Sequence, residues 1–274
     1  MSESHNILLV GCGKMGGAML RGWLSRGVAP GNVRVIEPFA EAASALRQEL
    51  SVSVVESVEA LDADFDPDIV VFAVKPQGMD DIVPSYARFA ANGAVSLSIA
   101  AGRTISYFET HLGNRAAIVR TMPNTPAAVA RGITAACPNG HVSAAQRTAC
   151  ETLLEAVGDV VWVESEEMID AVTAVSGSGP AYVFLMIECM ANAGEAQGLP
   201  ADIAARLARA TVAGSGELAR QSSEAADILR RNVTSPGGTT AAALDVLMAD
   251  EDGLQQLMDR AIKAATQRSR ELAG

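Results

Sequence analysis

The chain has 274 residues, 49% of them hydrophobic, and this length allows about two domains with a sizeable buried core. Its formal net charge of −11 repels nucleic acid phosphates and anionic membrane surfaces, so neither is an expected partner. The four cysteines form no Cys-x-x-Cys pair and the three histidines show no metal-ligand spacing, which argues against a disulfide scaffold and against a metal site.

The hydropathy of the chain gives no transmembrane or export signal. No uninterrupted apolar run reaches the roughly 18 residues that are needed to cross a bilayer. Residues 1–6 carry no basic flank and lead directly into a predicted strand, which is unlike a signal peptide. We therefore expect a cytoplasmic protein.

Short apolar runs alternate with helical patterns through residues 1–165, which is typical of βαβ units and a mostly parallel sheet. This part is predicted to be an α/β domain with a doubly wound, Rossmann-type sheet. The predicted strands are 7–10, 33–37, 52–55, 69–74, 94–99, 117–120, 133–137 and 160–163, and the helices between them include 15–26, 41–49 and 144–157.

Residues 166–274 show no strand pattern and are rich in alanine and other helix formers, so an all-helical second domain is expected. The predicted helices are 166–174, 180–197, 201–220, 224–231, 239–248 and 252–272. Segment 182–187 is apolar on every face, so its helix must be buried inside a bundle or against a second subunit. A helical domain of this size has little surface with which to bury it alone, and we therefore expect a homodimer.

A glycine-rich turn, Gly11-x-Gly13-x-x-Gly16, follows the first predicted strand and opens a helix. The first glycine allows a tight turn, the second lets a pyrophosphate approach, and the third lets the helix pack on the strand. Glu37 ends the second predicted strand, where an acid hydrogen-bonds the ribose 2′-OH of NAD and repels the 2′-phosphate of NADP. The alternative for Glu37 is an exposed acid before Pro38.

Three further segments follow predicted strands, at the sheet edge where ligands of this fold bind. Lys75, in the segment Ala73-Val74-Lys75-Pro76, can face cofactor phosphates or ribose, or only solvent. Small residues around Ala101 would let a flat ring pass close to the backbone, and Asn124 offers its amide to a nicotinamide carboxamide. Each segment alone is more often a turn, but three at the strand ends of one sheet favour a site.

A second glycine-rich loop lies at residues 232–240 and is followed by a helix-forming run. Pro236 cannot sit inside that helix, so the helix is expected to begin at or just after Gly237-Gly238. Free N–H groups and hydroxyls at a helix start form a cradle for a small anion. The alternative is an ordinary loop and helix cap. Together with the dinucleotide-type turn, this loop suggests a reductase.

These motifs together resemble pyrroline-5-carboxylate reductase along essentially the whole chain. The matching segments are 11–16, 73–76, 100–102, 122–126, 170–173, 176–182 and 232–240, of which the last two are the most specific. The resemblance implies reduction of a cyclic imine, 1-pyrroline-5-carboxylate, to L-proline by NADPH or NADH, the last step of proline biosynthesis. It also implies a helical domain that dimerises, often into larger rings of dimers such as a homodecamer.

The resemblance also implies roles for individual residues. Gly11, Gly13, Met15 and Gly16 should contact the cofactor pyrophosphate, Lys75, Ala101 and Asn232 should border the nicotinamide, and Ser235, Gly238, Thr239, Thr240 and Glu166 should surround the substrate. With the strand-end residues, the candidate cofactor set also holds Lys14, Glu37, Ala73, Val74, Pro76 and Asn124. Thr240 is the expected catalytic residue, because its hydroxyl can hydrogen-bond the ring nitrogen and relay a proton to it from water. No metal is implied.

Two alternatives to this reductase remain at the level of sequence. Hydroxyacid dehydrogenases also have a helical second half, but they typically use a lysine on an interdomain helix, and helix 180–197 contains none. A cofactor-binding regulatory protein without turnover is the other alternative. Cofactor preference is also open, because Glu37 favours NADH whereas the family resemblance favours NADPH.

Overall fold

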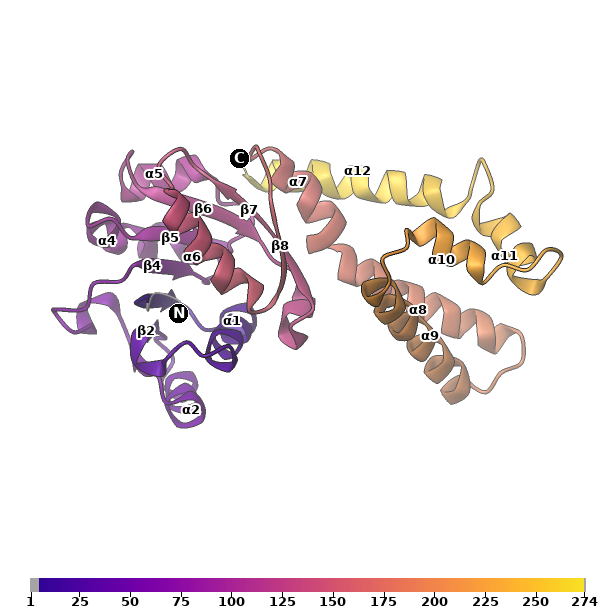
Figure 1. Cartoon of the computed structure of the whole chain (residues 1–274), viewed down its shortest axis with the longest axis horizontal. Helices are drawn as coiled ribbons and strands as arrows, with labels where there is room; N and C mark the ends of the chain where they lie inside the picture. The colour runs from indigo at the N-terminus through magenta and orange to yellow at the C-terminus, as the bar shows by residue number, and fades with distance from the viewer. Residues whose placement is uncertain (1–4, 274) are drawn as a thin grey trace. The chain divides into compact units, whose positions relative to one another are not determined.

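A computed structural model describes residues 5–273 as two compact units (Figure 1). Residues 1–4, which make up most of the N-terminal segment predicted to be unlike a signal peptide, lie outside the described residues, as does Gly274. Unit 1 is the chain up to Gly177 together with the segment from Thr266 onward, and unit 2 is Ser178–Ala265.

Unit 1 is built on one eight-stranded sheet with the strand order β3-β2-β1-β4-β5-β6-β7-β8. All neighbouring strands run parallel except β6 and β7, which are antiparallel. The eight predicted strands and the mostly parallel sheet are therefore confirmed. The strands are β1 (Ile7–Val10), β2 (Val33–Ile36), β3 (Ser53–Val55), β4 (Ile69–Phe72), β5 (Val95–Ser98), β6 (Ala117–Met122), β7 (Gly132–Pro138) and β8 (Gly158–Trp162).

Strands β1, β4, β5 and β6 are buried on both faces, as a doubly wound fold requires, whereas β8 at the edge is partly exposed. Successive residues of β1 point to opposite faces, so Ile7 and Leu9 join one apolar cluster while Leu8 and Val10 join another. Figure 1 shows the helices of unit 1 gathered around the sheet. These helices are α1 (Lys14–Ser25), α2 (Ala40–Leu50), α3 (Met79–Ile82), α4 (Ala87–Ala91), α5 (Ile105–Leu112), α6 (Ala144–Glu155) and α7 (Met168–Val172).

The boundary between the units falls after Gly177, whereas the sequence pattern placed a domain boundary after residue 165. The reason lies in α7, which packs on β6 and β7. Its Ile169 is buried in a small cluster with Met122 and Val163, and a π-helical turn, η6 (Thr173–Gly177), follows it. The sequence pattern therefore changes from strands to helices after residue 165, whereas the two packed units separate only after Gly177.

Unit 2 contains helices only, and among the described residues no strand follows residue 166, which confirms the predicted all-helical half. The pair α8 and α9 packs closely at Gly194, where a β-carbon would lie 3.3 Å from Leu199 and 3.4 Å from Ala204. The helices are α8 (Gly179–Ala196), α9 (Ala201–Gln221), α10 (Ala226–Asn232), α11 (Thr239–Leu247) and α12 (Leu254–Ala273), whose last turns belong to unit 1.

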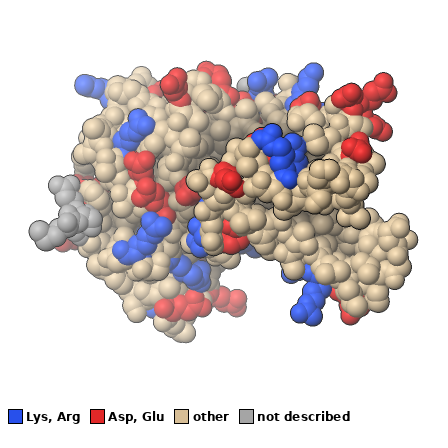
Figure 2. Space-filling model, turned by 45° about the vertical axis from the view of Figure 1, so that its right-hand side comes forward, with Lys and Arg blue, Asp and Glu red and all other residues tan. Residues whose placement is uncertain are grey.

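The single chain leaves the apolar helix α8 largely uncovered. Val183, Phe184 and Leu185 are 47%, 58% and 57% exposed. Within residues 5–273, the helical run Met168–Ala196 is the one segment long and apolar enough to span a membrane, judged by length and composition alone. Figure 2 shows charged side chains in small scattered groups, with wide uncharged stretches between them. The bundle of the single chain therefore does not bury α8, and the other predicted way, burial against a second subunit, stays a prediction.

Candidate functional site

The glycine-rich turn joins β1 to α1, and glycine is needed at each of its three positions for a different structural reason. Gly11 has a φ of +86°, and a β-carbon there would lie 2.6 Å from Val74 and 3.1 Å from the Ala73 carbonyl oxygen. A β-carbon at Gly16 would lie 2.6 Å from the Gly11 carbonyl oxygen. A β-carbon at Gly13 would meet no atom within 4 Å, so only this glycine faces open space. Gly13 therefore leaves room for a pyrophosphate at the N-terminus of α1.

Lys14 and Met15 form the first turn of α1 directly after this opening. Lys14 is exposed, whereas Met15 is half-buried and packs against the apolar cluster under α1. The backbone N–H groups of a first helical turn have no partner within their helix. Both residues can therefore donate to an anion through the backbone, and Lys14 adds an exposed positive charge.

Glu37 follows β2 and is only 6% exposed, so the alternative of an exposed acid is wrong. Its carboxylate accepts a hydrogen bond from the backbone N–H of Cys12 at 3.2 Å and another from that of Phe39 at 3.2 Å. These two bonds fix a negative charge against the glycine-rich turn. Burial, together with the charge of Glu37, raises the pKa of the Cys12 thiol to about 11, although Arg21 partly opposes this.

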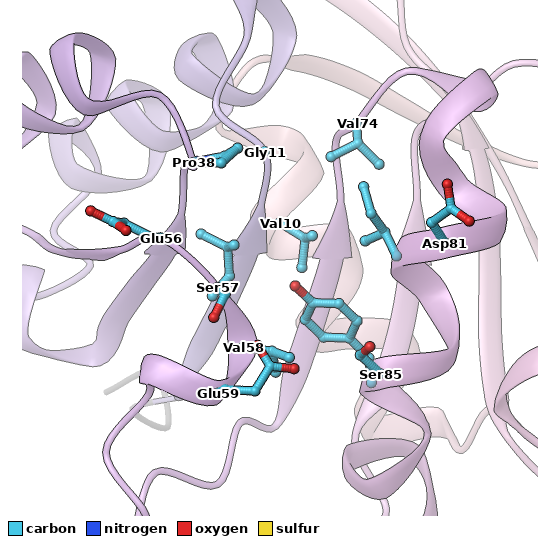
Figure 3. Close-up of a pocket in the computed structure, with 13 residues that line it drawn as sticks. Val10, Gly11, Pro38, Glu56, Ser57, Val58, Glu59, Val74, Asp81 and Ser85 are labelled. Atoms are coloured by element: carbon cyan, nitrogen blue, oxygen red, sulfur yellow. The ribbon is translucent and has the colours of Figure 1, made fainter.

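A pocket of about 260 Å³ adjoins this turn at the carboxyl ends of β1, β2 and β4 (Figure 3). Ligands of doubly wound sheets bind at this edge. None of the side chains that line it is Lys or Arg, whereas Glu56, Glu59 and Asp81 are acidic. Figure 3 shows Glu56 and Asp81 on opposite sides of the pocket, with Val10 between them.

Sequence reasoning missed these pocket residues. Glu56, Ser57 and Glu59 follow β3, whereas Ser85 and Tyr86 lie in the 3-10 turn η4 (Val83–Tyr86) after α3. For the first three, the place after a parallel strand was the available signal, since the carboxyl ends of these strands meet at one edge. No glycine-rich motif marks any of the five residues, so motif reading alone does not identify them.

The loops after β4 and β5 lie next to each other because β4 and β5 are parallel neighbours, with Phe72 opposite Ser98. Lys75 is exposed and precedes a short 3-10 turn, η3 (Pro76–Gly78). Ala101 is exposed at the tip of the second loop. The structure thus brings the predicted cofactor residues of these two segments to the same sheet edge as the glycine-rich turn.

Asn124 is 9% exposed, and both ends of its amide are already bonded within the protein. Its Nδ2 donates to the carbonyl oxygen of Ser176 at 3.1 Å, and its Oδ1 accepts from the N–H of Ile133 at 3.0 Å. The side chain therefore ties the start of β7 to η6. One N–H and one lone pair of the amide remain for a ligand.

Glu166 forms an ion pair with Arg120 of β6, whose Nη1 lies 2.7 Å from the Glu166 Oε1. The same oxygen accepts a hydrogen bond from the backbone N–H of Ile105 at 2.7 Å. The Arg120 side chain is only 5% exposed, so the carboxylate balances a buried charge. Glu166 thus holds the end of the loop after β5, and a direct contact with substrate stays a prediction.

In unit 2, α11 begins at Thr239 with Gly238 as its N-cap, which confirms the predicted helix start after the glycines. Gly237 has a φ of +69°, and the N–H of Gly238 bonds the carbonyl oxygen of Ser235 at 3.0 Å. The first backbone hydrogen bond of the helix runs from the N–H of Ala242 to the carbonyl oxygen of Gly238 at 3.2 Å. The N–H groups of Thr239, Thr240 and Ala241 lie before this bond and have no partner within the helix. Ser235, Gly238, Thr239 and Thr240 are therefore gathered at one helix N-terminus.

Asn232, which was predicted to border the nicotinamide, is the last residue of α10 in unit 2. It is exposed, and its Nδ2 donates to the carboxylate of Glu224 at 3.2 Å. Within residues 5–273 no group of three or more His, Cys, Asp or Glu residues is placed to hold a metal ion.

Two family descriptions match the chain, one in each half. Residues 6–102 match the family described as NADP oxidoreductase coenzyme F420-dependent. Residues 166–272 match the family described as pyrroline-5-carboxylate reductase dimerisation. The first range covers the glycine-rich turn and the loop after β5 as far as Gly102, and the second covers the loop before α11.

Curated relatives carry one name over nearly their full length. The pyrroline-5-carboxylate reductase of Pseudomonas aeruginosa is 41% identical over 99% of this chain and 98% of its own length. That of Synechocystis is 39% identical over 96% of this chain and 97% of its own length. Similarity of this extent includes both glycine-rich loops in one alignment.

Solved structures agree with the sequence comparison. A pyrroline-5-carboxylate reductase from Coxiella burnetii is 33% identical, covers 99% of this chain and 100% of its own, and gives a TM-score of 0.93. The Plasmodium falciparum pyrroline carboxylate reductase, solved with NADP bound, is 28% identical with a TM-score of 0.82 and full coverage of both chains. A prephenate dehydrogenase from Aquifex aeolicus, at 17% identity and a TM-score of 0.56, shares the fold alone.

Proposed function

Because the chain belongs to the pyrroline-5-carboxylate reductase family, we propose that it reduces 1-pyrroline-5-carboxylate to L-proline with a reduced nicotinamide dinucleotide. The observation that carries this proposal is a pair of helix N-termini behind glycine-rich turns. The one before α1 suits a pyrophosphate, and the one before α11 suits the carboxylate of a small imino acid.

The open space at Gly13 and the pocket beside Gly11 fit a dinucleotide. Backbone N–H groups at Gly13, Lys14 and Met15 would hold the pyrophosphate, while Lys75 and Ala101 would border the nicotinamide half. The cofactor supplies the hydride when bound. The protein contributes placement, since the reaction needs the imine carbon about 3–3.5 Å from the donor in an aligned geometry.

The start of α11 would fix the substrate carboxylate through the N–H groups of Thr239, Thr240 and Ala241. A helix N-terminus contributes about 0.3–1 kcal/mol to such an anion, and up to about 2 kcal/mol where it is partly buried. The hydroxyls of Ser235 and Thr239 can add donors at the same turn. Glu166 is a weaker candidate for the substrate pocket, because its Oε1 already accepts two bonds.

Thr240 is proposed as the catalytic residue. An imine carbon is electrophilic already and becomes more so when its nitrogen carries a proton. The half-buried Thr240 hydroxyl can donate to the ring nitrogen and receive a replacement proton from water. The hydride ends on the imine carbon, the proton ends on nitrogen, and the product is a secondary amine.

NADH is proposed as the preferred cofactor. Glu37 places a fixed charge at the end of β2, and no Lys or Arg lines the adjoining pocket to balance a 2′-phosphate. The family description of the N-terminal half and the NADP bound to the Plasmodium relative favour NADPH instead. The local charges of this chain are the reason to prefer NADH.

Homo-oligomers are supported by the match to a dimerisation family and by the exposed apolar residues of α8. We propose a dimer built on unit 2, which can assemble further into rings such as a decamer. A cytoplasmic location without nucleic acid or membrane partners fits the acidic composition and the biosynthetic relatives.

The test mixes the full-length protein with 1-pyrroline-5-carboxylate and NADH, then NADPH, and follows the loss of reduced-nicotinamide absorbance. The proposal expects turnover with the cyclic imine and none with a 2-oxo acid of similar size. Turnover of only the oxo acid would support a hydroxyacid dehydrogenase, and binding without turnover would support a regulatory protein.

A further inference from the structure

We infer that Arg103 is a positioning residue for the nicotinamide half of the cofactor, because it fastens the loop after β4 to the loop after β5. The inference rests on the proposed function for the identity of the ligand. It concerns a residue of this chain that neither the glycine-rich motifs nor the substrate loop includes.

The guanidinium of Arg103 reaches across to the first loop with two kinds of bond. Its Nε and Nη2 both donate to the carbonyl oxygen of Pro76, at 3.1 and 2.6 Å. Its Nη1 and Nη2 contact the carboxylate of Asp80 in α3, at 3.1 and 3.2 Å. The planar fork of arginine suits such a two-sided contact, whereas lysine offers only one point of charge.

An aromatic platform holds the guanidinium in this position. Its carbon lies 4.5 Å from the centre of the Tyr107 ring in α5, within the range of a cation–π contact. The Tyr107 ring lies 4.3 Å from the His111 ring on its own helix. The Arg103 side chain is only 23% exposed, so it is an ordered link between the loops.

The second loop is held from two other sides as well. A β-carbon at Gly102, which has a φ of +75°, would lie 3.0 Å from the carbonyl oxygen of Leu272 in the last turn of α12. At the end of the loop, the N–H of Ile105 bonds Glu166 at 2.7 Å. Neither contact reaches the loop after β4, whereas that of Arg103 does.

Lys75 and Ala101 are the residues proposed to border the nicotinamide, and each lies one or two positions from an end of this link. Pro76, whose carbonyl Arg103 binds, directly follows Lys75, and Arg103 itself comes two residues after Ala101. The link thus fixes the spacing between both walls before the cofactor arrives. A ligand that meets ordered loops pays less conformational entropy on binding.

The test compares full-length Arg103→Leu with Arg103→Lys and with the control Arg147→Leu. Arg147 also lies over an aromatic ring, 4.3 Å from the centre of Trp162, but it is on α6 and bridges no loop at the sheet edge. Calorimetry measures binding of NADH, and of ADP as a probe that reaches only the adenosine and pyrophosphate half.

Arg103→Leu is expected to weaken NADH about tenfold, a loss of about 1.4 kcal/mol, and to change ADP by less than about twofold. Arg103→Lys should recover part of the NADH affinity, because it can still donate to the Pro76 carbonyl. The Arg147→Leu control should match the wild type for both ligands. A purely structural role for Arg103 would weaken NADH and ADP alike.

Equal losses for NADH and ADP, or an unchanged NADH affinity, would overturn the inference. If Arg103→Leu does not fold, Arg103→Lys alone decides it by the same NADH-against-ADP comparison. Wild-type protein that binds NADH but reduces no imine would end the proposed function while leaving this comparison readable. If the wild type reduces the imine but the Arg103 variants bind NADH as tightly as the wild type does, the inference fails and the proposed function stands.

Discussion

Unit 1 and unit 2 bury their apolar residues in opposite ways. In unit 1 large side chains such as Trp23, Phe72 and Phe108 are fully buried by the chain itself. Among the described residues of unit 2, the buried hydrophobic side chains are the alanines Ala191, Ala204 and Ala208. The sheet of unit 1 completes its own core, whereas the helices of unit 2 leave their large apolar residues exposed in the single chain.

The largest expected effect is on the dimer that we propose for unit 2. Phe184→Asp should turn the dimer into a monomer, since an isologous interface buries the residue twice and each phenylalanine is worth about 1.5–3 kcal/mol. The dimer dissociation constant should rise on the order of 10³-fold, as measured by light scattering across a concentration series.

The control for this variant lies in unit 1. Phe39 is 73% exposed, and Phe39→Asp should leave the dimer intact, because the dimer that we propose is built on unit 2. An unchanged dimer with Phe184→Asp, or dissociation with Phe39→Asp, would contradict the contrast between the units.

A second prediction concerns the helix start in unit 2. Thr240→Ala should lower kcat/KM for the imine about 10²–10³-fold, because the hydroxyl that passes a proton to nitrogen is lost. The affinity for NADH, measured by fluorescence titration, should stay within about twofold. Thr234→Ala is the matched control, since that hydroxyl bonds the carbonyl oxygen of Arg230 at 2.7 Å. Equal loss of activity in both variants would remove Thr240 from catalysis.

A third prediction concerns the carboxylate that is fixed against the glycine-rich turn of unit 1. Glu37→Ser should shift the ratio of kcat/KM for NADPH over NADH by about tenfold toward NADPH, because the fixed carboxylate no longer repels a 2′-phosphate. Glu41→Ser, an exposed acid in the first turn of α2, should leave that ratio unchanged. A ratio that Glu37→Ser does not move would dispose of the proposed NADH preference.

The smallest expected effect is on the thiol of Cys12. Its pKa, raised to about 11, keeps it protonated and unreactive at neutral pH, and the thiolate appears only as the pH rises toward that value. Removing the charge in Glu37→Ser should lower this pKa and speed alkylation by iodoacetamide at pH about 9, read by peptide mass spectrometry. The wild-type protein, alkylated under the same conditions, serves as the reference. An unchanged alkylation rate at Cys12 would mean that burial alone sets the pKa.

The strands and helices were predictable because their patterns are local. Short continuous apolar runs such as Ile69–Phe72, and the glycines before α1 and α11, indicate a strand or a helix start within a few residues of sequence. The unit boundary was not predictable, because it depends on the packing of Ile169 against Met122, which is distant in sequence.

Side-chain partners were the least predictable part of the candidate site. Glu37 was expected beside the turn, and the structure adds that Cys12 and Phe39 hold it there. Glu166 and Asn124 have the right residue types for ligand contacts, but Arg120 and Ser176, far away in the chain, already engage them. Hydrogen bonds over such separations leave no periodic trace in a sequence.

The central claim is that this chain transfers a hydride from a reduced nicotinamide to the C=N carbon of a cyclic imino acid. The most direct measurement supplies NADH deuterated at the transferred position of the nicotinamide and analyses the product by mass spectrometry. The account predicts one deuterium on the δ carbon of proline for each NADH oxidised. Oxidation of NADH without labelled proline would contradict it.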